Sequence, residues 1–532
     1  MRPIVLYMLR HMSLNVNQGL TFENISPRTR RLSMIGLTLG MLIACLDGTI
    51  VATCGATIAT DLKDIGLYSW MLTAYLLCET SMIPIAGKLS DRYGRKPLFV
   101  LGLLIFIVSS VVAGMSTSME MMIACRGFQG LGGGILVPVA MASVADFYSP
   151  KERGKIQGIL GAVFGIGSGM GPLIGGFICN YFTWHWVFYI NVPLAAVCLA
   201  LTIRKFPMVA EANGKRIDYL GMAILTALIL DVLLYFEWIS DEMEFGEPRS
   251  IFMIVCAVAL AVAFVLRERR AEDPVLSPRL SSNRIVVFSA SYLFLFGMCM
   301  FGMMIYVSLY IATIYDYDSL QCGITLLPMV FGAMITSMAS GMKAYKTGFK
   351  VWVVAGAVLI TTALFLMSTM GGSKDLPVLC LYLFVFGLGM GCSMTTVMIA
   401  VQSVTPKDEM GMTTSAVSLM RNVGSTVGTA LFSMIISGSM NERFAETIYA
   451  PLADMLDLSG LGLLALRYMQ IPGFEGAGEA AVQIFSESTC WAFLNGACLF
   501  IIALVLALSI DTRKYRRELE RLHGSDDDAS GE

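Results

Sequence analysis

The sequence predicts an all-α membrane protein with fourteen transmembrane helices, arranged as two six-helix bundles with an inserted two-helix hairpin. The chain of 532 residues is 56% hydrophobic and 14% charged, whereas soluble domains are about one quarter charged. Fourteen apolar segments are long enough to cross a bilayer, which takes about 20 residues. A basic turn with two glycines, Gly87–Lys96, recurs at Gly341–Lys350, each time directly after an apolar segment. Such a duplication indicates two bundles built from one repeat.

The fourteen predicted spans follow one another along the whole chain. They lie at 33–57, 69–88, 98–116, 121–145, 156–180, 186–205, 217–237, 250–267, 285–314, 320–341, 350–370, 376–403, 411–437 and 485–510. If both termini are cytoplasmic, 30 of the 37 lysines and arginines lie in cytoplasmic segments and five lie in outside loops. Cytoplasmic loops of membrane proteins carry this positive excess, and omitting one span would destroy it. We therefore expect fourteen spans in the plasma membrane, with both termini cytoplasmic.

These spans divide the chain into five parts. We expect a cytoplasmic N-terminal segment (1–31), an N-terminal six-helix bundle (32–205), a linker with two accessory transmembrane helices (206–284), a C-terminal six-helix bundle (285–510) and a cytoplasmic tail (511–532). The C-terminal bundle includes an extracellular loop at 441–484, which is too long for a simple connection. The thirteen cysteines lie in apolar segments without metal-ligand spacing, so we interpret them as small buried hydrophobes and expect no disulfide.

Ionisable residues inside spans are candidate functional residues, because each costs about 3 kcal/mol or more in hydrocarbon unless it faces a cavity or a partner. Four stand out as candidates for proton coupling or the substrate cavity: Asp47, Glu79, Arg126 and Asp231. Glu79 lies mid-span without a local partner, and desolvation favours the neutral form of a carboxyl group, so it suits reversible protonation. Asp47 has the same potential, although a purely structural role explains it equally well. Arg126 can hold a carboxylate or backbone carbonyls near the cavity, and a packing ion pair explains it equally well. Arg421, by contrast, is interpreted as a structural bridge to backbone carbonyls.

The charged turn combines Gly87, Asp91, Arg92, Gly94 and Arg95. Asp91 can cap a helix N-terminus, while the two arginines can pair with acids on neighbouring spans, for example Asp146. The simpler reading is a solvated turn that only sets topology. Because Gly, Asp and Arg at fixed spacing exceed what charge bias needs, we interpret the turn as a gating loop.

Span five carries the run GSGMGPLIGG, in which Gly167, Gly171, Pro172, Gly175 and Gly176 stand out. Small residues let two helices approach closely, and a proline bends a helix. Ordinary tight packing explains the run as well as a functional seam does.

Several of these motifs together resemble the major facilitator superfamily, and specifically its fourteen-span drug:proton antiporter family. They are the Gly87–Lys96 turn, LDGTIV at 46–51, RGFQGLGGG at 126–134, GSGMGPLIGG at 167–176, WHWVFYINVP at 184–193, GITLLP at 323–328 and RNVGSTVG at 421–428. The resemblance implies the major facilitator fold and, for span five, the motif of antiporters. The chain departs from the pattern at ATCGATI after LDGTIV, at His185, and in the second turn, which lacks a counterpart of Asp91.

The resemblance and the intramembrane carboxylates lead to one expected function. We expect a proton-coupled antiporter that exports amphipathic drugs or toxic compounds by alternating access between the bundles. An alternative on the same fold is a dedicated exporter of an endogenous metabolite, lipid or siderophore. The sequence has no Walker A, HExxH or GxSxG motif, so we expect neither ATP-driven transport nor an enzyme. The expected partners are small amphipathic molecules, protons and the lipid bilayer, with no cofactor, metal or nucleic acid, and a monomeric chain.

Overall fold

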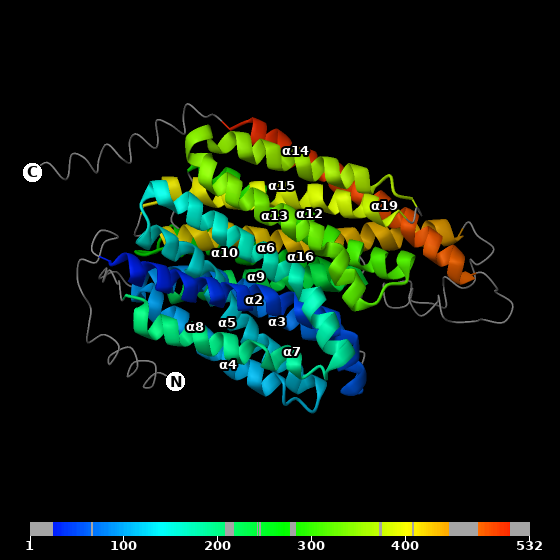
Figure 1. Cartoon of the computed structure of the whole chain (residues 1–532), viewed down its shortest axis with the longest axis horizontal. Coiled ribbons are helices and arrows are strands. Elements are labelled where there is room, and N and C mark those ends of the chain that lie inside the picture. Colours follow the sequence, from blue (N-terminus) through cyan, green and yellow to red (C-terminus); the bar gives the residue numbers. More distant parts are fainter. Residues whose placement is uncertain are drawn as a thin grey trace, which may run out of the picture.

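The computed structural model describes residues 25–64, 67–207, 218–241, 243, 246–276, 283–371, 375–406, 409–445 and 477–510. All regular secondary structure in these ranges is helical. The helices run roughly side by side along the long axis of the molecule, with most of the first half of the chain below the second half in Figure 1. Within a bilayer this arrangement lets every helix satisfy its own backbone hydrogen bonds.

The first bundle contains six spans. They are α2 (Pro27–Asp61), α3 (Tyr68–Tyr93), α4 (Arg95–Ala113), α5 (Met119–Phe147), α6 (Pro150–Tyr181), and the short α7 (Trp186–Tyr189) continued by α8 (Asn191–Lys205). Side chains fix where several of them begin. Ser26 accepts a hydrogen bond from the Thr29 N–H at the start of α2, and Ser118 accepts one from the Met121 N–H at the start of α5. Each hydroxyl satisfies a backbone donor that the first helical turn leaves unpaired.

The second bundle repeats this plan, and a hairpin separates the two. The second bundle consists of α12 (Arg284–Tyr315), α13 (Ser319–Thr347), α14 (Phe349–Met367), α15 (Leu376–Val404), α16 (Met410–Ala445) and α19 (Ala477–Leu508). The hairpin consists of α9 (Tyr219–Asp241) and α10 (Pro248–Glu268). A capping box starts α13, because Asp318 and Gln321 each bond the other's backbone N–H.

Every predicted span corresponds to one of these helices, which confirms the predicted fold class. Thirteen of the helices are long and apolar enough to cross a membrane. The fourteenth, α3, has a sufficient length of 26 residues but is less apolar, since it carries Glu79, Lys88, Asp91 and Arg92. It packs against α5 and α16, so it lies among the other spans although it is less apolar.

The two charged turns have the same backbone geometry. Gly94 separates α3 from α4 with φ 89° and ψ 154°, and Gly348 separates α13 from α14 with φ 91° and ψ 144°. This left-handed region is strained for residues with a Cβ, so glycine is required at both corners. The two turns are therefore duplicated in structure, but they are shorter than predicted, because α3 continues to Tyr93 and α13 to Thr347. We call the end of the molecule with these turns the Gly94 end, and the opposite end, where α4 stops at Gly114, the Gly114 end.

Glycines allow the two bundles to meet closely along α6 and α13. Near the Gly94 end, a Cβ on Gly154 would lie 2.3 Å from the Gly341 carbonyl oxygen. Near the Gly114 end, a Cβ on Gly323 would lie 2.4 Å from the Leu173 nitrogen. The backbones thus touch where side chains are missing, as in membrane helix pairs that lack a hydrophobic driving force.

The second contact between the bundles is made by α3 and α16, and the hairpin lies against both of them. Helix α9 packs on α3 and on α16. Thr73 of α3 donates a hydrogen bond to Glu237 of α9 at 2.5 Å, and Lys88 of α3 pairs with Asp273, just beyond α10, at 2.5 Å. The hairpin is therefore attached to the first bundle by polar contacts as well as by apolar packing.

A disulfide joins Cys54 of α2 to Cys179 of α6. The expectation of no disulfide is therefore wrong. The two cysteines are 125 residues apart, so their spacing gives no signal in the sequence, but the packing of α2 on α6 brings their Cα atoms to 6.1 Å. This separation lies within the range that a disulfide can bridge.

Some predictions fall on residues outside the described ranges. They concern most of the N-terminal segment 1–31, the central part of the loop 441–484, and the tail 511–532. The expected division into domains at 206–284 likewise includes residues outside those ranges.

Candidate functional site

A buried polar cluster lies inside the first bundle, with an ion pair between Asp47 of α2 and Arg126 of α5. The carboxylate and the guanidinium are 2.5 Å apart, and both side chains are fully buried. The Arg126 guanidinium also lies over the Tyr75 ring of α3, 4.2 Å from its centroid. Losing one partner of such a buried pair would leave an uncompensated charge, which costs several kcal/mol.

Uncharged side chains complete the coordination of Asp47. Asn191 of α8 donates to the Asp47 Oδ1 atom at 2.8 Å, and Gln129 of α5 donates to it at 3.3 Å. Gln129 also donates to Ser110 of α4 at 2.7 Å. All three residues are buried, and none was predicted, because a single amide or hydroxyl in an apolar run gives no distinctive sequence signal. They hold Asp47 in place from three helices.

Glu79 lies one turn beyond Tyr75 on α3 and is half-buried. Its charged neighbours are Arg421 of α16, Arg126 and Asp47. Within the described residues, Glu79 forms neither a hydrogen bond nor a contact ion pair with any of them. The structure therefore brings together three of the four predicted intramembrane residues, and leaves Glu79 as the carboxylate without a direct partner.

Asp231 is not part of this group. It lies on α9, in the hairpin, and is not among the charged neighbours of Glu79. One of its carboxylate oxygens is buried without a hydrogen bond in the described structure.

Arg421 does not make the bridge to backbone carbonyls that the sequence analysis expects. Its Nη2 atom donates to the Asn422 side chain at 2.8 Å, while its Nε and Nη1 atoms are buried without a hydrogen-bond partner in the described part of the chain. The guanidinium is directed toward the first bundle and lies over the Phe164 ring of α6, 4.5 Å from its centroid. The expectation fails because the guanidinium contacts the side chains of Asn422 and Phe164 instead of backbone carbonyls.

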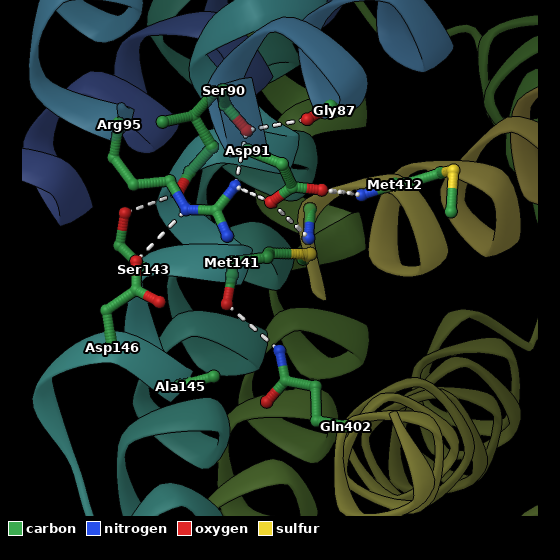
Figure 2. A network of polar contacts seen from close by, with 12 residues as sticks. Gly87, Ser90, Asp91, Arg95, Met141, Ser143, Ala145, Asp146, Gln402 and Met412 are labelled. Carbon is green, nitrogen blue, oxygen red and sulfur yellow. Dashed lines mark hydrogen bonds and ion pairs between the residues drawn. The ribbon is translucent and has the colours of Figure 1, made fainter. Parts of the chain in front are cut away.

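A second polar network lies at the Gly94 end (Figure 2). Asp91 accepts hydrogen bonds from the backbone N–H groups of Gly411 at 3.0 Å and Met412 at 2.8 Å, which are the first residues of α16. An acid at a helix N-terminus satisfies unpaired donors and interacts favourably with the helix dipole. Asp91 thus links the first bundle to the second.

Arg95 holds this aspartate from the side. It pairs with Asp91 at 2.7 Å and with Asp146 of α5 at 3.0 Å, and donates to Ser90. These contacts agree with the expected capping by Asp91 and with the expected partner Asp146. Gly87 is needed because a Cβ there would lie 2.3 Å from the Ser415 hydroxyl of α16.

Further contacts at the same end cross between the bundles. Gln402 of α15 donates to the Met141 carbonyl of α5 at 3.0 Å, as Figure 2 shows, and Arg153 of α6 donates to the Gln402 carbonyl at 3.4 Å. The two bundles are therefore in contact at the Gly94 end through α3, α5 and α6.

The glycines of span five serve two helix contacts rather than one face. A Cβ on Gly167, Gly171 or Gly175 would meet α2 of the same bundle, whereas a Cβ on Gly176 would lie 2.6 Å from the Leu320 nitrogen of α13. Pro172 lies inside the helix, next to the contact with Gly323 of α13. The run thus packs α6 between α2 and the other bundle.

The sequence profile described as Major Facilitator Superfamily matches residues 37–429, which is most of the chain. The chain belongs to the major facilitator superfamily. Two solved structures of this superfamily share the fold. The human organic anion transporter MFSD10 (TETRAN) has a TM-score of 0.61 at 17% identity and covers 91% of this chain and all of that one. The proton:xylose symporter XylE has a TM-score of 0.60 at 11% identity and covers 90% of this chain and 95% of that one.

Curated relatives in the superfamily are transporters. The multidrug transporter protein MdtP of Bacillus subtilis is 32% identical over 428 residues, covering 80% of this chain and 78% of that protein. The multidrug resistance protein 3 of the same bacterium is 30% identical, covering 77% and 81%. The protein is therefore a multi-pass membrane transporter of small molecules and not an enzyme. These relatives are consistent with the drug:proton antiporter family that the sequence motifs indicate.

Proposed function

We propose that the protein is a proton-coupled antiporter that exports amphipathic drugs or toxic compounds across the plasma membrane by alternating access, with both termini cytoplasmic. The observation that carries the proposal is Glu79, a transmembrane carboxylate that lies beside the Asp47–Arg126 ion pair and has no direct partner in the described structure. The names of the relatives MdtP and multidrug resistance protein 3 support drug efflux.

Glu79 and Asp47 have different parts in this proposal. Asp47 is fully buried and accepts hydrogen bonds from three side chains, so it is already engaged and holds Arg126 in place. Glu79 has only longer-range neighbours, so a proton or a cationic substrate can neutralise it without breaking a contact. Because both ligands neutralise the same carboxylate, they compete, and competition for one site is what exchange of a proton for a cation requires.

The network at the Gly94 end serves as the gate. Asp91 caps α16 only while the bundles are together at this end, so the contact stabilises the state that is closed on the cytoplasmic side. The glycine seam of α6 and α13 lets the bundles pack closely in that state and rock without interlocked side chains.

The proposal is tested by substrate-induced proton release in inverted membrane vesicles, using a pH-sensitive dye and a panel of lipophilic cations. We expect several cations to release protons in the wild type and the response to be lost in Glu79→Gln. Glu120→Gln is the matched control, because Glu120 is an exposed carboxylate in the first turn of α5. A full response in Glu79→Gln would refute the coupling role of Glu79. No response to any cation in the wild type would refute drug:proton exchange.

A second candidate is the dedicated export of an endogenous metabolite. A relative named Acurin A biosynthesis cluster MFS-type transporter, from Aspergillus aculeatus, is 28% identical and covers 82% of this chain, which favours this alternative. It predicts proton exchange with one compound of the producing cell and none with the cation panel.

A further inference from the structure

Arg421 carries hydrogen-bonding capacity that nothing in the described structure uses. Its side chain is 5% exposed, and two of its three guanidinium nitrogens are buried without a partner. Buried polar groups in proteins are nearly always hydrogen-bonded, so a cation left in this state indicates a missing acceptor. The donors of an arginine form a rigid fork that matches a carboxylate, which makes an anionic oxygen the best acceptor.

The surroundings of Arg421 place this acceptor between the two bundles. Arg421 belongs to α16 of the second bundle, whereas the ring beneath its guanidinium, Phe164, belongs to α6 of the first. Its electrostatic neighbours, Cys45 and Glu79, belong to α2 and α3 of the first bundle. The contact with the Phe164 ring uses the face of the guanidinium as a cation–π interaction, so it does not use up the N–H donors.

The charges around Glu79 divide into two sets. Asp47 and Arg126 neutralise each other in direct contact. Glu79 and Arg421 have opposite charges on opposite bundles, and no contact ion pair forms between them in the described structure. Tyr75 and Cys45 are the other titratable groups nearby, and both are neutral acids near pH 7.

We infer that this protein binds zwitterionic substrates, with a protonated amine at Glu79 and a carboxylate or similar anionic oxygen at Arg421. The inference rests on the proposed function and specifies its substrate class. Such a substrate connects the two bundles through one charge on each side, so it engages both halves that alternating access moves. A cation alone uses only Glu79 and leaves the Arg421 donors unpaired.

The amine and the anionic group of a ligand have opposite effects on proton binding to Glu79. An amine at Glu79 replaces the proton on this carboxyl group, so binding of a zwitterion releases a proton. An anion without an amine binds Arg421 and repels an ionised Glu79, so it favours proton uptake. The direction of proton movement on binding therefore reports which of the two groups a ligand uses.

The test compares a piperazinyl quinolone carboxylic acid with its methyl ester, which keeps the amine and lacks the anionic charge. Equilibrium binding to the purified full-length protein in lipid nanodiscs gives both affinities. We expect the acid to bind the wild type roughly tenfold more tightly or better, as for hydrogen bonds to charged groups. In Arg421→Gln we expect this preference to disappear, with ester binding unchanged within about twofold. Unchanged ester binding also shows that the variant is folded.

Two further variants separate a specific role from a structural one. Arg421→Lys keeps the charge and should retain part of the preference for the acid. Arg443→Gln is the matched control, since Arg443 is a half-exposed arginine on the same helix and pairs with Glu487. It should change neither affinity.

Three results would overturn the inference. They are equal binding of acid and ester to the wild type, an equal loss of both in Arg421→Gln, and no binding of either compound to a wild type that exchanges protons for lipophilic cations. The last result would leave the antiporter proposal intact. Conversely, selective binding of the acid by a protein that releases no protons in vesicles would support the Arg421 site and refute the antiporter.

Discussion

Replacing Asp91 with asparagine tests the contact that joins the two bundles at the Gly94 end. The aspartate accepts two backbone hydrogen bonds from α16 and holds Arg95. Asparagine has the same shape, but its side chain has one acceptor oxygen, and its NH₂ group would face the second N–H. The variant therefore keeps the packing and removes one hydrogen bond and the charge.

The size of the effect follows from these contacts. A hydrogen bond to a charged group contributes about 1.5 to 3 kcal/mol. The interaction of a charge with a helix N-terminus adds about 0.3 to 1 kcal/mol. Together they give about 2 to 4 kcal/mol, which shifts the equilibrium between the closed and open Gly94 end by roughly thirtyfold to several hundredfold. Substrate binding itself should change little, because Asp91 is not near Glu79 in the charge network.

The shift can be measured as a distance distribution between spin labels in nanodiscs. Arg31 on α2 and Lys346 on α13 are exposed residues of different bundles at this end, so labels there report its opening. We expect Asp91→Asn to populate longer distances. Asp146→Asn is the control, since it removes an equal charge from the same Arg95 but lies wholly within the first bundle. An unchanged distribution, or the same change in both variants, would refute the capping of α16 as the gate.

Two other predictions concern stability and packing. Asp47→Asn leaves Arg126 as an uncompensated buried charge and should reduce the free energy of unfolding by about 3 to 5 kcal/mol. The effect is measured as a lower Tm in detergent. An unchanged Tm would show that the pair is not needed for folding. Gly176→Ala puts a Cβ 2.6 Å from the Leu320 backbone and should slow transport in vesicles. Gly438→Ala is the control and should not slow it, because nothing lies within 4 Å of a Cβ there. Equal transport rates in the two variants would contradict a tight seam between the bundles.

The sequence predicts the spans well because the bilayer imposes a length and a charge rule on each one. It even identifies α3, whose charged residues lower its hydropathy, because a charged segment with glycines follows its apolar part, although the helix itself continues to Tyr93. The internal partners of the charges are harder to predict. Glu79, Asp47 and Arg126 are recognisable because a charge in a span is costly, whereas the uncharged Ser110, Gln129 and Asn191 cost less and give a weaker signal.

Other features depend on packing that the sequence does not encode locally. The disulfide joins cysteines from two helices far apart in the chain. The two unused nitrogens of Arg421 become evident only when its surroundings are known. Likewise, the spans of the hairpin are predictable, but its docking against both α3 and α16 is not.

The docking of the hairpin has a consequence for how compounds reach the centre of the protein from the lipid. In a protein of two bundles, the contact between α3 and α16 is a place where a molecule dissolved in the membrane could enter laterally between the bundles. Here α9 covers that contact, and its apolar residues pack with those of both helices. Helix α9 therefore blocks the path of a lipophilic compound that diffuses in the membrane toward the contact between α3 and α16. If transport follows the proposed alternating access, α9 must slide on at least one of the bundles, so this side stays closed only if the contact surface is smooth. The apolar side chains between α9 and α16 provide such a surface, while the hydrogen bond of Glu237 with Thr73 keeps the hairpin on the side of α3.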